Sequence, residues 1–436
     1  MGQDIGSTAP NGASYSRAVR AANDLRSALE AVSVERIAAR LARLSRIGQT
    51  PEGGVTRLGL TSEEREAHDL VGGWLAATGF ASRHDDAGNL MCSRGDGPWV
   101  LAGSHLDTVP NGGAFDGALG VVAAVEVAES SREAGLDLPL AVAVWMGEEG
   151  PRFGGGLFGS ATATGLIEPG AWDRADAAGV SARQAAAALL GRAPELETAL
   201  LDRSAFRAYL EVHMEQSSVL AESDRPVGLV TRIVGISHGE VRVEGTADHA
   251  GATRMHERGD ALAAASECVL AVERLAREAG DRAIATVGEL HISPGAPNVI
   301  PGSCTFSLDV RAPEDADRRE LFAVIDAAAR AIGRRRGVQV EVLHVGEALA
   351  APLDGDVIRM IGAACAEVGV PDPPAIPSRA AHDAQNLARF GVPTGMVFVR
   401  STGGSHNPFE QVEPADAALG AQVLLVACSL LAHAGR

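Results

Sequence analysis

An apolar run, a turn-rich polar loop and a second apolar run follow one another between residues 99 and 127. The first run is Trp99–Ala102, the loop carries His105 and Asp116, and the second run is Val121–Val127. This order predicts a strand, a loop and a helix. In an open α/β sheet such a loop lies at the carboxyl edge, where ligands usually bind. The chain is therefore expected to build an α/β domain with a ligand site at this loop.

Strand-like and helix-like segments alternate after this loop and return near the end of the chain. Leu140–Met146 is predicted to be a strand, and Gly159–Gly165 the helix-like segment after it. Met396–Val399 is predicted to be a strand that precedes a final apolar helix. Alternation of this kind favours an α/β fold with a mainly parallel sheet. We expect this sheet to form the larger part of the protein.

Two helical patterns precede these strands. Apolar residues recur at helical spacing from Tyr15 to Ile47, and Pro51 begins the break that follows. Thr61 and Glu64 predict the N-cap and the capping box of the next helix. Residues 1 to about 15 are rich in Gly, Ser, Asn and Pro and are expected to be frayed.

The pattern changes near Pro226, where Glu240–Glu244 alternates like a half-exposed antiparallel strand. The segments that follow complete a β-α-β-β-α-β order: Asp260–Ala279, Ile284–Ile292, Ser303–Val310, Ala316–Ile332 and Val338–Val342. This order predicts one compact α+β domain. We expect it to occupy residues 226–342, inserted into a catalytic domain formed by residues 1–225 and 343–436.

Charge and composition exclude several classes of function. The net charge is −18 and no basic stripe is present, which argues against nucleic-acid binding. No stretch approaches about 18 uncharged apolar residues and no apolar signal core starts the chain, so we expect neither a membrane span nor secretion. The five cysteines lack metal-ligand spacing and are typical of reduced core residues. The predicted location is the cytoplasm.

Possible metal ligands stand at the ends or beginnings of strand-like segments: His105, Asp116, Glu149, His213 and His406. A mixed set of histidines and carboxylates suits zinc, manganese, cobalt or nickel. Two ions held by these ligands require a bridging group, and a carboxylate has two oxygens for that purpose. Asp116 is the expected bridge. Asp107, two residues after His105, is expected to orient the imidazole ring.

Glu148 and Glu149 are adjacent in a short segment between Gly147 and Gly150. Neighbouring side chains diverge, so one carboxylate can bind metal while the other faces the attacking water. Glu148 is predicted to take a proton from that water and to return it to the leaving nitrogen. Taken singly, a histidine is more often a hydrogen-bonding core residue and a glutamate pair is usually a solvated surface. Five such groups at strand edges make that interpretation much weaker.

The motifs resemble the M20 metallopeptidase superfamily, and within it the hydantoinase/carbamoylase-type amidases. That branch includes N-carbamoyl-L-amino acid hydrolases, β-ureidopropionases and allantoate amidohydrolases. The resemblance extends from about Leu44 to the C-terminus. It rests on these segments: Gly48–Arg57, His105–Gly117, Glu148–Phe153, Glu211–Gln216, Asp248–Thr253, Pro297–Gly302, His382–Ala384 and Gly404–Pro408.

The resemblance implies two divalent ions in each chain, bridged by Asp116. His105 and His213 would hold one ion, and Glu149 and His406 the other. True M20 peptidases typically carry an acidic ligand where this sequence has His213. The histidine therefore favours hydrolysis of a ureido C–N bond over hydrolysis of peptides.

The resemblance also implies that the inserted domain is a lid and a dimerisation surface. His249 matches a lid residue that would polarise the carbamoyl oxygen. Asn298 and Arg311 match residues that would hold a substrate carboxylate, often across the dimer. Gln216 would recognise the terminal carbamoyl amide, and Ala381 would line the same substrate pocket.

Several positions depart from the usual pattern of the branch. Arg379 and Ala381 stand in a segment that commonly reads SGAGHDA, where glycine lets the backbone approach a ligand. Arg254 replaces a frequent proline, and Ser217 replaces a frequent glycine. These changes leave the expected metal ligands untouched and concern the substrate pocket.

The sequence thus predicts a metal-dependent amidohydrolase of linear amides that converts an N-carbamoyl-L-amino acid to the amino acid, CO2 and NH3. One alternative is another ureido substrate: allantoate, ureidoglycolate or β-ureidopropionate. A second is hydrolysis of N-acyl amino acids or dipeptides, and a third is a non-catalytic dimeric binding protein. The intact ligand set together with Glu148 argues against the third. The expected partners are a small ureido or amide substrate with a carboxylate and a second copy of the chain in a homodimer.

Overall fold

The computed structural model describes residues 12–433, so the expectation for residues 1 to about 15 lies largely outside the described residues. The chain divides into two compact units. Unit 1 consists of Met1–Thr231, Leu353–Ile376 and Ala381–Arg436, and unit 2 of Arg232–Pro352 and Pro377–Ala380.

Both boundaries differ from the predicted positions, for reasons of strand pairing. The expected boundary after residue 342 falls inside β13 (Gln339–Ala348), which stays paired with β7 (Gly235–Glu244) past a bulge as far as Ala348. The expected boundary after residue 225 precedes β6 (Val227–Ile233). The first residues of β6 pair with β16 (Thr394–Val399) and belong to unit 1.

Unit 1 is built on a sheet in the order β1-β2-β4-β3-β5-β16-β6, and β15 also pairs with β6. The last residues of β6, Arg232 and Ile233, pair with β14, and all residues of that pair belong to unit 2. The four central strands, β4, β3, β5 and β16, are parallel to one another, and the flanking pairs are antiparallel. The expected α/β class with a mainly parallel central sheet is confirmed. The remaining strands are β1 (Ala81–His84), β2 (Leu90–Ser93), β3 (Trp99–His105), β4 (Leu140–Trp145), β5 (Phe206–Met214), β14 (Ala351–Pro352) and β15 (Ala375–Ser378).

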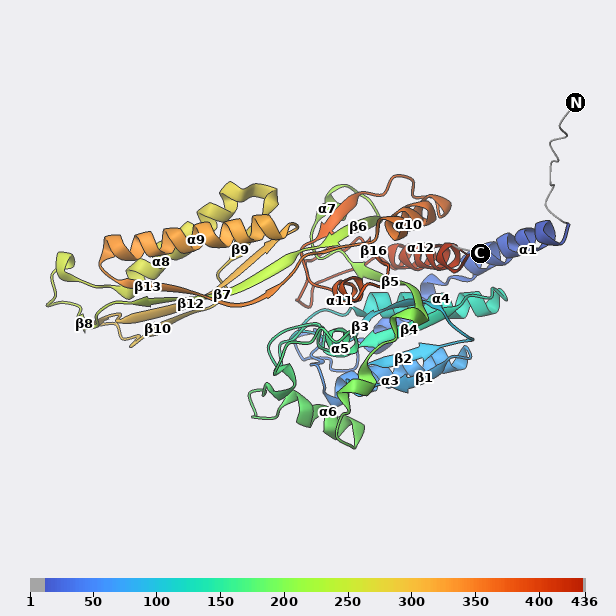
Figure 1. Cartoon of the computed structure of the whole chain (residues 1–436), viewed down its shortest axis with the longest axis horizontal. Coiled ribbons are helices and arrows are strands. Elements are labelled where there is room, and N and C mark those ends of the chain that lie inside the picture. The colour runs from blue at the N-terminus through green and yellow to red at the C-terminus, as the bar shows by residue number, and fades with distance from the viewer. Residues whose placement is uncertain (1–11, 434–436) are drawn as a thin grey trace, which may run out of the picture. The chain divides into compact units, whose positions relative to one another are not determined.

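Helices cover the sheet of unit 1, and α4 and α12 pack against its central strands (Figure 1). Buried Val, Leu and Ala side chains of these two helices form much of the core. The helices of the unit are α1 (Gly12–Ala31), α2 (Val34–Leu44), α3 (Ser62–Ala77), α4 (Ala118–Glu133), α5 (Phe158–Ala163), α6 (Ala182–Leu190), α7 (Val219–Glu222), α10 (Gly355–Glu367), α11 (Asp383–Phe390) and α12 (Pro414–His433).

Two local predictions need correction. The single helix expected from Tyr15 to Ile47 is two helices, because Ser33 has an extended backbone and its hydroxyl caps α2 by accepting the Arg36 N–H at 3.1 Å. The capping box at α3 is only half formed. Thr61 accepts the backbone N–H of Glu64 at 3.3 Å, but the Glu64 carboxylate does not return to the Thr61 N–H and binds other backbone groups.

α12 is the one helix in the described part of the chain that is long and apolar enough to cross a membrane. About 78% of its most apolar window is buried inside the protein, as in a core helix. The five cysteines are all free and buried, as the sequence predicts. Burial raises the pKa of their thiols, to about 12 for Cys92 and about 11 for Cys365.

Unit 2 contains an antiparallel sheet in the order β10-β12-β7-β13, with β9 also paired to β12. α8 and α9 lie along one face of this sheet (Figure 1). β8 (Asp248–His249) and β11 (Val299–Ile300) form a separate two-stranded sheet. The other elements are α8 (Ala261–Ala279), β9 (Ile284–Thr286), β10 (Leu290–Ser293), β12 (Ser303–Ala312) and α9 (Asp315–Arg336).

The strand predicted at Ile284–Ile292 is two short strands. Between them the backbone N–H groups of Gly288 and Glu289 leave the ladder and donate to the hydroxyl of Ser307, at 3.2 and 3.0 Å. The side chain of one β12 residue therefore replaces a backbone partner at this point. Both short strands still pair with β12, on either side of the interruption.

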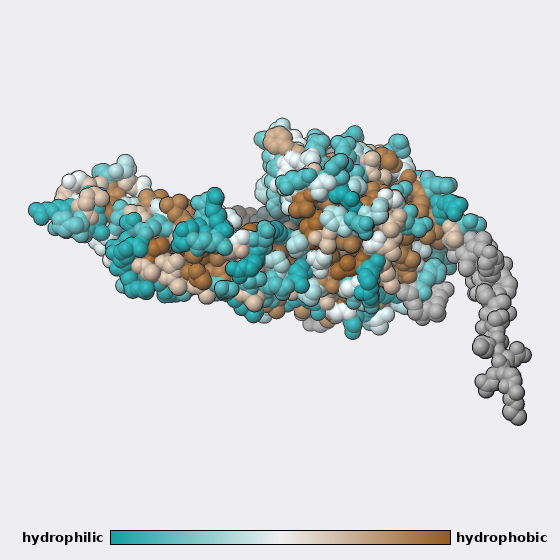
Figure 2. Space-filling view, turned by 90° about the horizontal axis from the view of Figure 1, so that it is seen from above, coloured by the Kyte–Doolittle hydropathy of each residue, from teal (hydrophilic) through white to brown (hydrophobic). Residues whose placement is uncertain are grey.

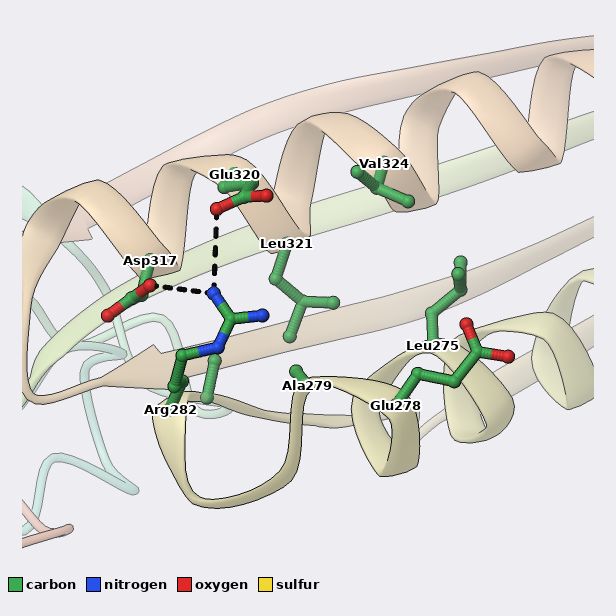
Figure 3. Close-up of a pocket in the computed structure, with 9 residues that line it drawn as sticks. Leu275, Glu278, Ala279, Arg282, Asp317, Glu320, Leu321 and Val324 are labelled. Carbon is green, nitrogen blue, oxygen red and sulfur yellow. Dashed lines mark hydrogen bonds and ion pairs between the residues drawn. The ribbon is translucent and has the colours of Figure 1, made fainter.

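An ion-pair cluster joins the two helices of unit 2 at one end. Arg282, just after α8, approaches Asp317 at 3.0 Å and Glu320 at 3.6 Å on α9, beside a cavity of about 160 Å³ (Figure 3). Leu275 and Leu321 line the cavity wall. Seen from above, the surface of this unit mixes hydrophilic residues with apolar ones (Figure 2). This end of the unit therefore carries structural contacts between helices, and none of the predicted ligands or catalytic groups lines the cavity.

Candidate metal centre

The first group of predicted ligands forms at the carboxyl edge of the central sheet. His105 is the last residue of β3 and His213 lies near the end of β5, and these parallel strands are neighbours. Nε2 of His105 lies 3.6 Å from Oδ1 of Asp116, and Nε2 of His213 lies 3.1 Å from the same oxygen. All three side chains are buried. The ends of two adjacent strands and one loop thus present three donor atoms to one point.

Gly117 ends the loop after β3 and lets the loop pass close to the His105 ring. Its φ of +64° lies in the left-handed region, and a Cβ there would stand 2.6 Å from the His105 ring. Glycine alone meets both conditions without strain. The ring can therefore pack directly beneath the start of α4, next to Asp116.

A second group of ligands faces the other oxygen of Asp116. Nε2 of His406 lies 3.7 Å from Oδ2 of Asp116 and 3.1 Å from Oε2 of Glu149. His406 has a φ of +60°, in the left-handed region that a non-glycine residue seldom adopts. The two groups, His105–Asp116–His213 and Asp116–Glu149–His406, share only Asp116. That geometry supports the predicted bridging position of this carboxylate.

Backbone and carboxylate groups hold the histidine rings. Nδ1 of His213 is 3.0 Å from the carbonyl oxygen of Met214, which leaves its Nε2 for a ligand. Nδ1 of His105 is 3.2 Å from the carbonyl oxygen of Asp107 and 3.3 Å from Oδ1 of the same residue. The Asp107 carboxylate also accepts the backbone N–H groups of Glu148 and Glu149, at 2.8 and 2.9 Å. Asp107 thus contacts both the first histidine and the loop with the glutamate pair.

The donor set fits divalent cations. Within the described residues, Nε2 of His213 is buried without a hydrogen-bond partner, although it points at Asp116. Burial works against charged histidines, but Asp116 outweighs it and raises the pKa of His213. Burial also works against ionised Asp116, yet His213 and His105 lower its pKa well below the usual value. Imidazole nitrogens and carboxylate oxygens gathered around buried negative charge match the ligands that zinc and its neighbours prefer.

Glu148 stands apart from the two ligand groups but close to one of them. Its side chain is 9% exposed, and Oε2 lies 3.8 Å from Nε2 of His105. Burial raises the pKa of Glu148 well above its usual value, and the charge of Glu149 acts in the same direction. A carboxylate with a raised pKa at the edge of a metal site suits a group that accepts and returns a proton.

Glu211 and His382 form a further layer that the sequence motifs contain but that we did not predict as part of the site. Glu211 accepts hydrogen bonds from the Ser104 hydroxyl at 2.8 Å and from the Ala384 N–H at 3.0 Å. The His382 ring packs edge-on against His213, with the ring centres 4.5 Å apart. Glu211, His213 and His382 lie close enough to hold an ion, but hydrogen bonds already engage both oxygens of Glu211. The His382 ring thus packs against an expected ligand, and Glu211 lies beside the two rings.

Glu410 was also missed. Its Oε1 accepts the backbone N–H groups of Phe115 and Asp116, at 2.8 and 3.1 Å, so it holds the loop of the expected bridge. Burial raises the pKa of Glu410 to about 7. The contact joins positions almost three hundred residues apart in sequence, and the only sequence signal is that Glu410 follows His406 by four residues.

Gln216 lies at this site and not in open solvent. Its Nε2 donates to Oδ2 of Asp116 at 2.9 Å, and the Ser405 hydroxyl donates to the same oxygen at 2.9 Å. Within the described residues, Oε1 of Gln216 is buried without a partner. One end of the amide is thus fixed, and the other offers an acceptor for an N–H group.

The other predicted substrate residues divide between the units. Ala381 belongs to unit 1, directly before His382. His249 and Asn298 lie together at the β8–β11 end of unit 2, where the Ala250 N–H donates to the Asn298 carbonyl at 3.1 Å. Nδ1 of His249 accepts the backbone N–H groups of Gly251 and Ala252, at 3.0 and 3.1 Å. In the neutral ring the proton then sits on Nε2.

Arg311 lies in a groove of about 790 Å³ on the sheet of unit 2, which Arg379 also lines. Its Nε and Nη2 donate to the two carboxylate oxygens of Asp309, at 2.8 and 3.1 Å. Nη1 donates to the carbonyl oxygen of Arg379 at 3.2 Å. Three of the five guanidinium N–H groups are engaged, and one remains on each terminal nitrogen. That remaining edge has the fork geometry that a carboxylate accepts.

Comparison with known proteins agrees with this geometry. The profile of peptidase family M20/M25/M40 matches residues 101–429 of the chain. The chain belongs to this family. The predicted resemblance is confirmed, and M20 proteins are metal-dependent, in keeping with the ligand groups described above.

Relatives within the M20 family cover nearly the whole chain. An N-carbamoyl-L-amino acid amidohydrolase of Geobacillus stearothermophilus is 40% identical over 398 residues, which are 89% of this chain and 96% of that protein. An allantoate amidohydrolase of Escherichia coli is 33% identical over 393 residues, 87% of this chain and 94% of that protein. A crystal structure of a hydantoinase/carbamoylase-family amidase from Burkholderia vietnamiensis superposes with a TM-score of 0.82 at 33% identity, over 92% of this chain and 97% of that one.

Proposed function

We propose that this protein hydrolyses the ureido C–N bond of an N-carbamoyl-L-amino acid, releasing the amino acid, CO2 and NH3. That it is an amidohydrolase of linear, non-peptide amides follows from its relatives, several of which are N-carbamoyl-L-amino acid amidohydrolases. The observation that carries the proposal is the pair of ligand groups sharing Asp116, with Glu148 beside them.

Two divalent ions are proposed, one held by His105 and His213 and one by Glu149 and His406, with Asp116 in common. Bound there, such ions supply a Lewis acid and lower the pKa of water. Zinc, manganese, cobalt and nickel all suit these ligands. Asp107 fixes His105 and the glutamate loop in place, because its carboxylate contacts both.

Glu148 is proposed as the group that moves the proton. It accepts a proton from the attacking water and delivers it to the leaving nitrogen. The carbamate that is formed then decays to ammonia and carbon dioxide. Its environment supports both steps, because burial raises the pKa of its carboxyl. A carboxyl with the ordinary pKa of glutamate would be a poorer proton donor near neutral pH.

His249 is proposed as the donor to the carbamoyl oxygen. With Nδ1 occupied by two backbone N–H groups, its Nε2–H faces outward and can stabilise negative charge on that oxygen. Asn298 and the free edge of Arg311 are proposed to hold the substrate carboxylate, and Ala381 to line the same pocket. Gln216 offers Oε1 to the carbamoyl NH2 group.

A substrate panel tests this assignment. The purified protein, stripped of metal and then given manganese, cobalt, nickel or zinc, is assayed for ammonia release from N-carbamoyl-L-amino acids, allantoate, ureidoglycolate and β-ureidopropionate. N-acetyl amino acids and dipeptides serve as non-ureido controls, for which the released amino acid is measured because their hydrolysis yields no ammonia. We expect the highest kcat/KM with an N-carbamoyl-L-amino acid. After chelation of the metal we expect no hydrolysis of any substrate. A preference for another ureido compound would move the substrate assignment, and a preference for dipeptides would refute it.

We also propose a cytoplasmic homodimer formed through unit 2, in which His249 serves the metal centre of the partner. Inactive His249→Ala and inactive Glu148→Gln chains are mixed and allowed to exchange. In a mixed dimer one site would have both an intact Glu148 and an intact His249. Recovered activity supports the arrangement. If no activity returns after verified exchange, His249 acts in its own chain's site or elsewhere.

A further inference from the structure

The short loop that carries Glu148 and Glu149 is held by side-chain oxygens at four successive backbone N–H groups. Asn89 accepts the Met146 N–H at 2.9 Å, and Glu64 accepts the Gly147 N–H at 2.8 Å. Asp107 accepts the N–H groups of Glu148 and Glu149, as described above. Asn89, Glu64 and Asp107 are all fully buried. No backbone strand or helix supplies these acceptors, so three side chains fix the course of this loop.

The carbonyl groups of the same loop are also engaged. The backbone N–H groups of Leu157, Phe158 and Gly159 donate to the carbonyls of Glu148, Gly147 and Met146, at 2.6, 3.1 and 2.7 Å. Gly147 has a φ of +64°, a conformation that other residues adopt only with strain. The loop is therefore held on both sides in an unusual conformation. A loss of one acceptor would leave a buried N–H group unpaired and favour rotation of that peptide.

Glu64 differs from Asp107 in its contacts, because it touches the loop and not the expected ligands. It lies in the first turn of α3, and its two oxygens accept the backbone N–H groups of Leu60 at 2.7 Å and Gly147 at 2.8 Å. Its Oε1 also lies 3.9 Å from Nε2 of His68. Asp107 also touches the ring of an expected ligand. Among the residues that the structure describes, Glu64 forms no hydrogen bond or ion pair with an expected ligand, and its hydrogen-bonded connection to the metal centre passes through the Gly147 N–H group.

Burial of the Glu64 carboxyl group is unfavourable in free energy and needs support from its surroundings. A carboxylate removed from water is unfavourable unless it is paired or hydrogen-bonded. Arg57 supplies a nearby positive charge and is itself buried, with Nη1 donating to the carbonyls of Leu44 and Ile47 at 3.0 and 2.9 Å. Burial lowers the pKa of Arg57 to about 10, and the charges of Glu64 and Asp107 oppose that change. A residue needed only to begin a helix would not require this support, because Thr61 already caps α3.

We infer that Glu64 is a positioning residue for the hydrolytic reaction, holding the Gly147 peptide so that the Glu148 carboxylate faces the reacting centre. The inference rests on the proposed function, since it assumes that Glu148 moves the proton. The held N–H belongs to the Met146–Gly147 peptide, and Glu148 is the residue after Gly147. Rotation of that peptide changes the backbone that leads into Glu148 and displaces its side chain. A misplacement of about 1 Å at a catalytic group can cost on the order of 100-fold in rate.

The test compares Glu64→Met, Glu64→Gln and the control Glu126→Met. Methionine keeps the length of the side chain and removes both acceptors, whereas glutamine keeps one. Glu126 is a fully buried helical glutamate that binds Arg36, Arg40 and the Ser33 N–H, away from the loop. Each variant is measured for kcat, KM, bound metal and Tm, with the ureido substrate that the wild-type protein hydrolyses best.

For Glu64→Met we expect kcat to fall on the order of 10- to 100-fold while KM and bound metal stay within about twofold of wild type. Glu64→Gln should lose less, and it remains informative if the methionine variant does not fold. Glu126→Met should lower Tm and leave kcat unchanged. A purely structural Glu64 would instead lower Tm or metal content without a selective loss of kcat, which would overturn the inference.

A double-variant cycle separates this inference from the proposed function. If Glu64 acts through Glu148, adding Glu64→Met to Glu148→Gln should cause no further loss of kcat. A full additional loss would show that Glu64 acts elsewhere. If Glu148→Gln alone keeps its activity, the proposed role of Glu148 fails. If Glu148→Gln is impaired but both Glu64 variants are not, only the present inference fails.

Discussion

Nε2 of Gln216 donates a hydrogen bond of 2.9 Å to Oδ2 of Asp116. The side chain expected to bind the carbamoyl amide is thus fixed to the carboxylate expected to bridge the metal ions. This contact orients the amide and leaves Oε1 of Gln216 as a buried acceptor without a partner in the described residues. A carbamoyl group carries an NH2 that could donate to Oε1, whereas an acetyl group carries a methyl there.

Gln216→Leu should therefore impair carbamoyl substrates selectively. We expect kcat/KM to fall by about 10- to 100-fold with an N-carbamoyl amino acid, because a site built to hydrogen-bond an NH group discriminates strongly by that bond. The kcat/KM for the matching N-acetyl amino acid should change much less. Parallel initial-rate measurements check this. Equal losses with both substrates would assign Gln216 to support of Asp116 alone.

Glu148→Gln should remove most turnover and leave the ligands in place. Loss of a general base typically costs about 100-fold or more in kcat. Bound metal, measured by mass spectrometry of the desalted protein, should match wild type, since Glu148 belongs to neither ligand group. Retained turnover with both ions still bound would contradict the assigned role.

Asp116→Ala should reduce metal content more than Glu149→Ala does. Asp116 belongs to both ligand groups, whereas Glu149 belongs to one, so the first change would affect both proposed ions and the second only one. Equilibrium dialysis at limiting zinc or manganese compares the two variants with wild type. Full occupancy of both ions in Asp116→Ala would reassign the bridge.

Asp85 should make the free energy of unfolding depend on pH. Burial raises its pKa to about 6 in the folded protein, compared with about 3.9 in an unfolded chain. The folded protein binds this proton more tightly, so the free energy of unfolding falls as pH rises between these values, by about 3 kcal/mol in all. Asp85→Asn removes this dependence.

The stability of Asp85→Asn relative to wild type should thus increase by about 3 kcal/mol between pH 4 and pH 7. Urea unfolding in the presence of a chelator measures it without the contribution of bound metal. Asp372→Asn serves as the control, since it makes the same change of side chain at an exposed position. A constant difference between Asp85→Asn and wild type across this range would contradict the prediction.

Arg379 and Ala381 should set the preference among substrates. The Arg379 side chain is 40% exposed and shares its groove with Arg311, and its ion-pair partner is Asp281, at 3.7 Å and fully exposed. A second carboxylate on the substrate could replace that weak partner. Changing both positions to glycine should lower kcat/KM for ureido dicarboxylates by about tenfold relative to neutral analogues. An unchanged ranking of substrates would mean that neither side chain selects among them.

The sequence predicted the elements whose signals are local. The apolar run at Trp99–Ala102, the loop and the apolar run at Val121–Val127 correspond to β3 and α4, because strand and helix periodicity are short-range properties. The break between α1 and α2 was missed, since Ser33 caps a helix there without any glycine or proline nearby. The split between β9 and β10 depends on Ser307, a residue of another strand.

In the site too, the residues with a local sequence signal were predicted, and those that act through contacts between distant parts of the chain were not. The possible ligands were identified because histidine and carboxylate side chains follow strand-like runs. Glu64 and Glu410 were not identified as site residues, because each acts by accepting backbone N–H groups of a distant loop. Such contacts depend on how the chain folds back on itself and leave no periodic signal in the sequence.

The left-handed backbone of His406 has an evolutionary consequence. A residue other than glycine costs roughly 1 kcal/mol or more in this conformation, and asparagine tolerates it better than most. At this position the requirement for an imidazole therefore opposes the preference of the backbone. In a gene copy released from selection for activity, replacement of His406 would carry little penalty in folding and could even increase stability. Retention of histidine here among diverging copies would thus be a sensitive record of continued selection for metal binding.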